Sequence, residues 1–271
     1  MSTSVSSAAD HPYATLGRIG YAFKGVLYFL LGVLAFQAAR GGGDAEGQRG
    51  VLRTVADSSF GGVLLTVLAI GLAAYALWRL AGAILDLEDH GTDAEGLAKR
   101  AGYVISAGAY GLLAYASYRI LQDGGSGSGG GGTQENAQTA LALPGGRFVL
   151  GAVALGVLGY GIYQFVRAYR ASFMDKFALD GIAASHRTTI RRLGQAGLAA
   201  RGVVYVVIGA ALGTAAYQAD SSEAVGLDGA LSMLRDGPYG TLLLGAVGLG
   251  LAAYGLYCGV NAKYRRFKRA G

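Results

Sequence analysis

Long runs of apolar residues, separated by short polar stretches, form the dominant pattern of this chain. Six runs have the length of a membrane-spanning helix, for which about 20 residues suffice. The pattern therefore predicts six spans, at residues 19–39, 61–85, 101–121, 146–166, 196–219 and 240–260. No basic cluster precedes the first run and no small-residue cleavage pattern follows it, so we expect a retained anchor rather than a signal peptide.

The spans repeat in pairs. The first, third and fifth spans share a pattern that reads Gly20-x3-Lys24-Gly25-x2-Tyr28, then Gly102-x3-Ser106-Ala107-x2-Tyr110, then Gly197-x3-Arg201-Gly202-x2-Tyr205. The other three spans share Gly-x3-Tyr followed three residues later by Trp or Tyr, at residues 71–78, 156–163 and 250–257. Repetition at this regularity predicts three copies of a two-helix unit, at residues 16–90, 97–175 and 193–266, within one transmembrane domain that covers residues 1–271.

Two spans per copy mean that all copies enter the membrane from the same side. Parallel repeats are related by an axis along the membrane normal, which predicts an all-α protein with six helices around a pseudo-threefold axis. Between the helices of copies one and three, apolar residues at helical spacing predict a short interfacial helix that begins near Gly50 or Gly229. In copy two, the Ser/Gly tract at residues 124–132 predicts a flexible loop instead.

These motifs resemble a bacterial membrane family of unknown function that is built of three tandem two-helix repeats. The resemblance runs from about Leu16 to Arg266. It implies the six-helix fold and brings no catalytic residue with it. Copy two departs from the pattern, with Ser106 in place of a cation and Ala107 in place of glycine.

Composition and charge agree with a membrane protein. Hydrophobic residues make up 52% of the chain and 47 residues are glycine, while only 15% are charged, against about a quarter in soluble proteins. Six of the 23 Lys and Arg residues fall on one predicted side: Arg40, Arg49, Arg53, Arg119, Arg147 and Arg235. The remainder fall on the side of both termini, which the positive-inside rule makes cytoplasmic. We therefore expect a bacterial inner-membrane protein that contacts anionic lipid head groups, rather than a nucleic-acid binder.

The repeated tyrosines are the first candidate site. Tyr28, Tyr75, Tyr110, Tyr160, Tyr205 and Tyr254 are expected at one depth, with Trp78, Tyr163 and Tyr257 about one helical turn away. Such a layer either lines a polar constriction or pocket on the axis, or packs between helices with each hydroxyl bonded to a neighbouring carbonyl. Repetition does not separate the two interpretations, because packing also repeats.

The cations Lys24, Arg79 and Arg201 are the second candidate site. Lys24 lies so close to Arg40 in sequence that only about 22 Å of helix separates them, less than the hydrocarbon core of roughly 30 Å. Lys24 must therefore lie inside the bilayer boundary. The simpler interpretation is that these cations extend their stems to the inner interface. The alternative is an inner vestibule that attracts anions or lipid phosphate.

The sequence shows no pattern typical of a catalytic or metal-binding site. The predicted spans contain no Asp or Glu, His11, His90 and His186 are isolated in sequence, and Cys258 is alone. We expect no metal site, no cofactor and no enzymatic activity. The chain is then a non-catalytic structural or accessory membrane component, within a larger membrane complex or a homo-oligomer. The alternative is a channel or transporter for a small solute, ion or lipid along the axis, gated at the tyrosines.

Overall fold

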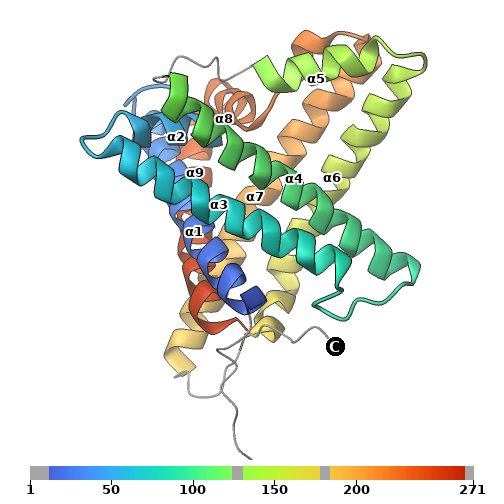
Figure 1. The fold of residues 1–271 in the computed structure, drawn as a ribbon. Helices are drawn as coiled ribbons and strands as arrows, with labels where there is room; N and C mark the ends of the chain where they lie inside the picture. The colour runs from blue at the N-terminus through green and yellow to red at the C-terminus, as the bar shows by residue number, and fades with distance from the viewer. Residues whose placement is uncertain (1–11, 124–130, 178–183, 266–271) are drawn as a thin grey trace, which may run out of the picture.

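The computed structural model describes residues 12–123, 131–177 and 184–265, and most of them are helical. The six long helices are α1 (Pro12–Ala39), α3 (Gly61–Ile84), α4 (Ala94–Asp123), α6 (Gly146–Arg170), α7 (Ala184–Gln218) and α9 (Gly240–Tyr264). Short helices connect them in pairs: α2 (Gln48–Ala56), α5 (Gly131–Leu141) and α8 (Leu227–Asp236), with 3-10 turns η1 (Ser172–Lys176) and η2 (Ser221–Glu223). The three short helices gather at one end of the bundle (Figure 1), which we call the short-helix end.

Five of the predicted spans form helices that are long and apolar enough to cross a membrane, namely α1, α3, α6, α7 and α9. The sixth, α4, is 30 residues long, but it is not among the helices that meet this criterion within the described ranges. Its predicted span is rich in Gly, Ala, Ser and Tyr and includes Arg119, which lowers its hydropathy. The protein is an all-α membrane protein, and α4 is the long helix without a sufficiently apolar stretch in the part of the chain that the structure describes.

The long helices pack in a cyclic order. The first helix of each copy packs beside the second helix of the preceding copy, which gives the pairs α1–α9, α4–α3 and α7–α6. Within copies one and three, α1 also packs on α3 and α7 on α9. Figure 1 shows α3 and α4 side by side across the front of the bundle, and α6 beside α7. This order is the one that a pseudo-threefold arrangement of three two-helix repeats requires.

The glycines of α1 and α7 permit these close approaches. A Cβ added at Gly32 would lie 2.2 Å from the backbone nitrogen of Ala252 in α9. At Gly209, the equivalent position of copy three, it would lie 2.6 Å from the Leu158 side chain in α6. The expectation that small residues allow close helix packing is confirmed at both interfaces.

The ring is open at one place. Copies one and three close their helix pair through a glycine, because a Cβ at Gly20 would lie 2.5 Å from the Cα of Tyr75 and one at Gly197 would lie 2.6 Å from the Cα of Tyr254. The equivalent residue of copy two, Gly102, has nothing within 4 Å of that position. Consistently, α4 and α6 do not pack closely in the described part of the chain. Copy two therefore leaves a gap between its two long helices.

The short helices follow the sequence pattern in two copies and depart from it in the third. In α2 the apolar face is confirmed, with Val51 and Leu52 fully buried. In copy two the predicted loop is wrong at its end, because residues 131–132 begin helix α5. The helix is held by Ala137, which is buried in an apolar cluster with α6 and α7. The rest of the predicted loop, residues 124–130, lies outside the described residues.

Candidate functional site

The repeated tyrosines pair across the interfaces between copies. Each pair has one ring from a first helix and one from a second helix, and all three pairs are edge-to-face: Tyr28–Tyr254 at 4.9 Å and 76°, Tyr110–Tyr75 at 4.6 Å and 71°, and Tyr205–Tyr160 at 5.0 Å and 80°. Aromatic rings favour this geometry at such distances. We call these six residues the tyrosine layer. The structure brings all of them together around the axis, as pairs related by the repeat.

Two cations lie within the tyrosine layer. Lys24 donates to the Tyr75 hydroxyl at 2.9 Å, and Arg201 donates to the Tyr254 hydroxyl at 2.8 Å. These are equivalent pairs, each formed within one copy. Arg201 also donates to the Tyr205 hydroxyl at 2.9 Å. Both side chains are buried, with 4% of Lys24 and 7% of Arg201 exposed, so neither extends to the interface as the simpler interpretation expected.

Both cations also lie over tyrosine rings. The Lys24 ammonium is 4.5 Å from the ring centroid of Tyr75 and 4.8 Å from that of Tyr110. The Arg201 guanidinium is 4.5 Å from the centroid of Tyr254. Such contacts are worth about 0.5 to 2 kcal/mol each, more where water is excluded. The rings thus partly replace the hydration that the cations lose on burial.

Copy two breaks the symmetry of this layer. Ser106 stands where Lys24 and Arg201 stand in the other copies, so Tyr160 has no cation of its own copy. Tyr160 is 41% exposed, whereas its counterparts Tyr75 and Tyr254 are buried. Both differences lie on α4 and α6, the two long helices of copy two that do not pack closely in the described part of the chain. The layer therefore holds two cations rather than three, and its open side is at copy two.

The aromatic residue three positions after the layer tyrosine of each second helix shows the same difference between copy two and the other copies. Trp78 and Tyr257 are buried, while Tyr163 is 49% exposed. Arg79, beside Trp78, donates to the Tyr75 hydroxyl at 2.9 Å, so that this hydroxyl accepts from two cations. Arg79 is thus a third cation that contacts the layer, and it lies on the side away from the short-helix end, beside Trp78.

A cavity of about 520 Å³ lies at the short-helix end, where segments of all three copies meet. Its lining includes Gln48 and Arg53 of α2, Leu113 of α4, Thr133 of α5 and Asp228 of α8. Gln48 donates from its amide to the Tyr28 hydroxyl at 3.2 Å, which links the cavity wall to the tyrosine layer. Sequence reasoning missed this cavity, because α5 was not expected.

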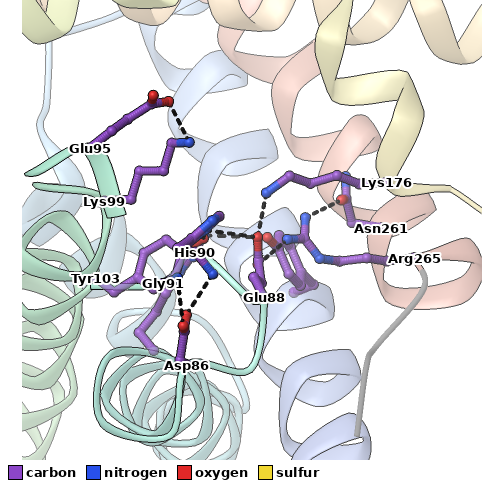
Figure 2. Close-up of polar contacts among 12 residues, drawn as sticks. Asp86, Glu88, His90, Gly91, Glu95, Lys99, Tyr103, Lys176, Asn261 and Arg265 are labelled. Carbon is purple, nitrogen blue, oxygen red and sulfur yellow. Dashed lines mark hydrogen bonds and ion pairs between the residues drawn. The ribbon is translucent and has the colours of Figure 1, made fainter. Parts of the chain in front are cut away.

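A second cluster lies at the opposite end of the bundle, where the described chain begins and ends (Figure 1), and Figure 2 shows its contacts. Glu88, which follows α3, accepts from Lys176 in η1 and from Arg265 after α9. Each of these residues closes a different copy. We call the three residues the Glu88 cluster. His90 approaches Glu88 to 3.6 Å and is hydrogen-bonded to Tyr103 at 2.8 Å, so His90 is not isolated in space.

The charges of this cluster shift one another's titration. Burial opposes ionisation of Glu88, but Arg265 and Lys176 outweigh it and hold the pKa of this carboxyl well below its usual range. Burial and the neighbouring Arg265 lower the pKa of Lys176 to about 8, against the opposing effect of Glu88. The carboxylate is therefore ionised throughout the physiological range and links the ends of the three copies. No sequence pattern pointed to this contact, apart from the basic residues after each second helix.

Of the remaining candidates, Cys258 lies beside the tyrosine layer, in hydrogen-bonding contact with Tyr254, and the two others are histidines. Cys258 is fully buried and has a free thiol, His186 is exposed in α7, and His11 lies outside the described residues. Within the described ranges, no three His, Cys, Asp or Glu side chains are grouped so as to hold a metal ion.

Fold and site together define an all-helical membrane protein of three two-helix repeats. Comparison with known families agrees: the model described as "Domain of Unknown Function (DUF1206)" matches three times, at residues 19–86, 101–171 and 196–265. The chain belongs to this family, which confirms the resemblance seen in its motifs. It is also 36% identical over 251 residues to the "Uncharacterized protein YxxB" of Bacillus subtilis (strain 168), covering 92% of this chain and 90% of that protein. No solved structure matches significantly.

Proposed function

We propose that this chain is a non-catalytic structural or accessory component of the membrane, with an axis closed to solutes. The observation that supports this is the packing of the tyrosine layer. Four of its six rings are buried, those of Tyr28, Tyr75, Tyr110 and Tyr254. They form two edge-to-face pairs, Tyr28–Tyr254 and Tyr75–Tyr110, and the Lys24 ammonium lies over a ring of each pair. A path for solutes would have to displace these rings.

Reconstitution in liposomes tests the closed axis. Vesicles that contain the protein are loaded with potassium chloride and a small-anion reporter, and efflux is compared with that of protein-free vesicles. We expect equal rates for the wild-type chain and for the triple variant in which Tyr28, Tyr110 and Tyr205 become Phe. The variant keeps the rings and removes three hydroxyls, so it opens no gap. Faster efflux from wild-type vesicles, lost in the triple variant at normal expression, would contradict the proposal.

A second candidate function, passage of a small solute or ion along the axis, is favoured by the cavity at the short-helix end. Its polar lining reaches the tyrosine layer through Gln48. The discriminating variant is Thr133→Cys, which places a thiol in the cavity wall, whereas the native Cys258 is buried. If the cavity is an entrance, a bulky thiol reagent slows efflux from vesicles with this variant. If the axis is closed, the reagent does not change the efflux rate.

We further propose that both termini face the cytoplasm of a bacterial inner membrane. The distribution of Lys and Arg supports this orientation. A single-cysteine labelling experiment tests it, because Cys258 is buried and contributes little background. A membrane-impermeant maleimide should label Ser59→Cys in whole cells and should label His186→Cys only after cell lysis. The opposite labelling pattern would reverse the orientation.

The proposed partners are anionic lipid head groups at the cytoplasmic face and either further membrane proteins or a second copy of the chain. The basic residues after the spans support the first, because each Lys or Arg near an anionic surface contributes about 1 kcal/mol. Native mass spectrometry of the protein released from membranes distinguishes a monomer, a homo-oligomer and a mixed complex. A lipid-free monomer would contradict both proposals.

A further inference from the structure

The tyrosine layer contains more positive charge than its neighbours balance. Lys24 and Arg201 share two rings: the Lys24 ammonium is 5.9 and 5.6 Å from the centroids of Tyr28 and Tyr254, and the Arg201 guanidinium is 5.4 and 4.5 Å from the same centroids. In the described part of the chain, neither cation forms an ion pair with a carboxylate. The partly buried carboxylate of Glu88 is already paired with Arg265 and Lys176.

Arg201 also has a donor to spare. Its Nε is buried and has no hydrogen-bond partner, while its two other nitrogens donate to Tyr205 and Tyr254. A buried donor without an acceptor costs about 1 to 3 kcal/mol, and more when the group is charged. Two like charges over the same rings add repulsion. An acceptor with negative charge, placed beside Nε, removes both costs at once.

Two routes lead toward this position. The cavity at the short-helix end has Gln48 in its wall, whose amide donates to the Tyr28 hydroxyl, and the Tyr28 ring centroid lies 5.4 Å from the Arg201 guanidinium. In α6, which does not pack closely on α4, the exposed Tyr160 contacts Tyr205, whose hydroxyl accepts from Arg201. The first route would admit a soluble anion, and the second a lipid head group.

We propose that Lys24 and Arg201, with the tyrosine hydroxyls, form a binding site for a phosphate-type oxyanion. A phosphate group carries one or two negative charges, which matches the two cations. Its several oxygens can accept from Arg201 Nε, from the Lys24 ammonium and from tyrosine hydroxyls together, in charge-assisted hydrogen bonds. The site is compatible with a closed axis, because binding does not require passage.

Thermal unfolding in detergent tests the site with inorganic phosphate as the probe. A ligand that binds only the folded protein raises the midpoint in proportion to ln(1 + [L]/Kd). We expect phosphate to raise the midpoint above that in chloride at equal ionic strength. The Arg201→Gln variant should show about tenfold weaker binding or none. Arg201→Lys keeps the charge but lacks Nε, so it should bind phosphate more weakly than wild type and more tightly than Arg201→Gln. Arg170→Gln, an exposed cation of α6, is the matched control and should behave as wild type.

A second arm distinguishes the source of the phosphate. The protein is placed in nanodiscs of phosphatidylcholine with or without phosphatidylglycerol, and bound lipid is counted by native mass spectrometry. Retention of phosphatidylglycerol that is lost in Arg201→Gln but kept in Arg170→Gln identifies a head group as the ligand, and an effect of inorganic phosphate alone identifies a soluble anion. The proposal is overturned if neither probe distinguishes Arg201→Gln from Arg170→Gln. If the Arg201→Gln variant does not fold, Lys24→Gln removes the other cation and should weaken the binding of the same probes. Efflux from liposomes, which tests the closed axis, is not affected by either outcome.

Discussion

Replacing Glu88 by Gln should weaken the contact between the ends of the three repeats and so destabilise the folded protein. The carboxylate accepts from Lys176 of copy two and Arg265 of copy three, and it follows α3 of copy one. Glutamine preserves the shape of the side chain and one acceptor oxygen, but it removes the charge. Arg265, whose side chain is 7% exposed, then keeps its own charge without a counter-ion. The change is therefore the loss of one partner from a largely buried ion pair.

The expected loss follows from burial. Removing one partner of a fully buried pair costs about 3 to 5 kcal/mol. Glu88 retains 16% side-chain exposure and Lys176 retains 38%, so solvent screens part of the cluster. We therefore expect a smaller loss of about 2 to 3 kcal/mol, at or below the lower limit of that range. For a domain of this size, each kcal/mol corresponds to roughly 2 to 4 °C, which predicts a midpoint lowered by roughly 4 to 12 °C.

The measurement is thermal unfolding of the purified protein in detergent, with Glu95→Gln as the matched control. Glu95 also pairs with a lysine, Lys99 at 2.7 Å, but its side chain is 76% exposed. Exposed pairs of this kind contribute about 0.3 to 0.5 kcal/mol, so the control should shift the midpoint by no more than roughly 2 °C. Equal midpoints for Glu88→Gln and Glu95→Gln would refute the reasoning.

The effect of acid gives the same experiment a second readout. Because the pKa of Glu88 is depressed in the folded protein, its contribution is complete above its unfolded pKa of about 4.3 and is lost as pH falls through the lower folded value. The difference between wild type and Glu88→Gln should therefore be the same at pH 7 and pH 5, and it should shrink only in stronger acid. A difference that is already halved at pH 5 would contradict the depressed pKa.

Three further predictions use the same unfolding assay. Gly20→Ala should prevent stable folding, because its Cβ would lie 2.5 Å from the Cα of Tyr75. Gly102→Ala meets nothing within 4 Å, so it should be neutral or should stabilise the protein by up to about 1 kcal/mol. Equal effects of the two substitutions would contradict the open side at copy two. The pKa of Lys176 is lowered to about 8 in the folded protein. Wild type should therefore gain stability relative to Lys176→Met as pH rises from about 8 to the ordinary lysine pKa of about 10.4. A relative loss of stability over that range would contradict the lowered pKa. Cys258, fully buried, should react with a small maleimide only on unfolding, and rapid reaction of the folded protein would show that α9 is not packed as described.

The fold was largely predictable because its signals are periodic. Apolar runs predicted the long helices, and the repeated Gly-x3-Tyr motifs predicted three two-helix copies around one axis, but not which helices of different copies would pack together. The glycine at the start of each second helix illustrates why the pattern is so regular: a Cβ at Gly61, Gly146 or Gly240 would lie 1.6 to 1.8 Å from a carbonyl oxygen of the preceding turn. All three copies make the same tight turn, and only glycine fits it.

The site was predictable in its membership but not in its arrangement. Spacing predicted the six tyrosines at one depth, with Lys24 and Arg201 beneath them, but it could not say that each cation would bond to the tyrosine of its own copy. Those contacts depend on helix rotation, which sequence periodicity does not fix. The Glu88 cluster was missed for a related reason: its members lie in connecting segments, where a charged residue has no periodic signature and was counted as a solvated charge.

The pairing of α1 with α9 bears on how the protein is made. Because 200 residues separate Ala39 from Gly240, a ribosome that adds about 5 to 20 residues per second takes roughly 10 to 40 s to supply the partner of the first helix. Until then, the glycine-lined face of α1 that α9 later covers, with Gly25 and Gly32, meets lipid or an insertion factor. Copies one and two thus enter the membrane as an incomplete arc. The ring order is completed only by the last helix, which makes the insertion of α9 the committing step of biogenesis.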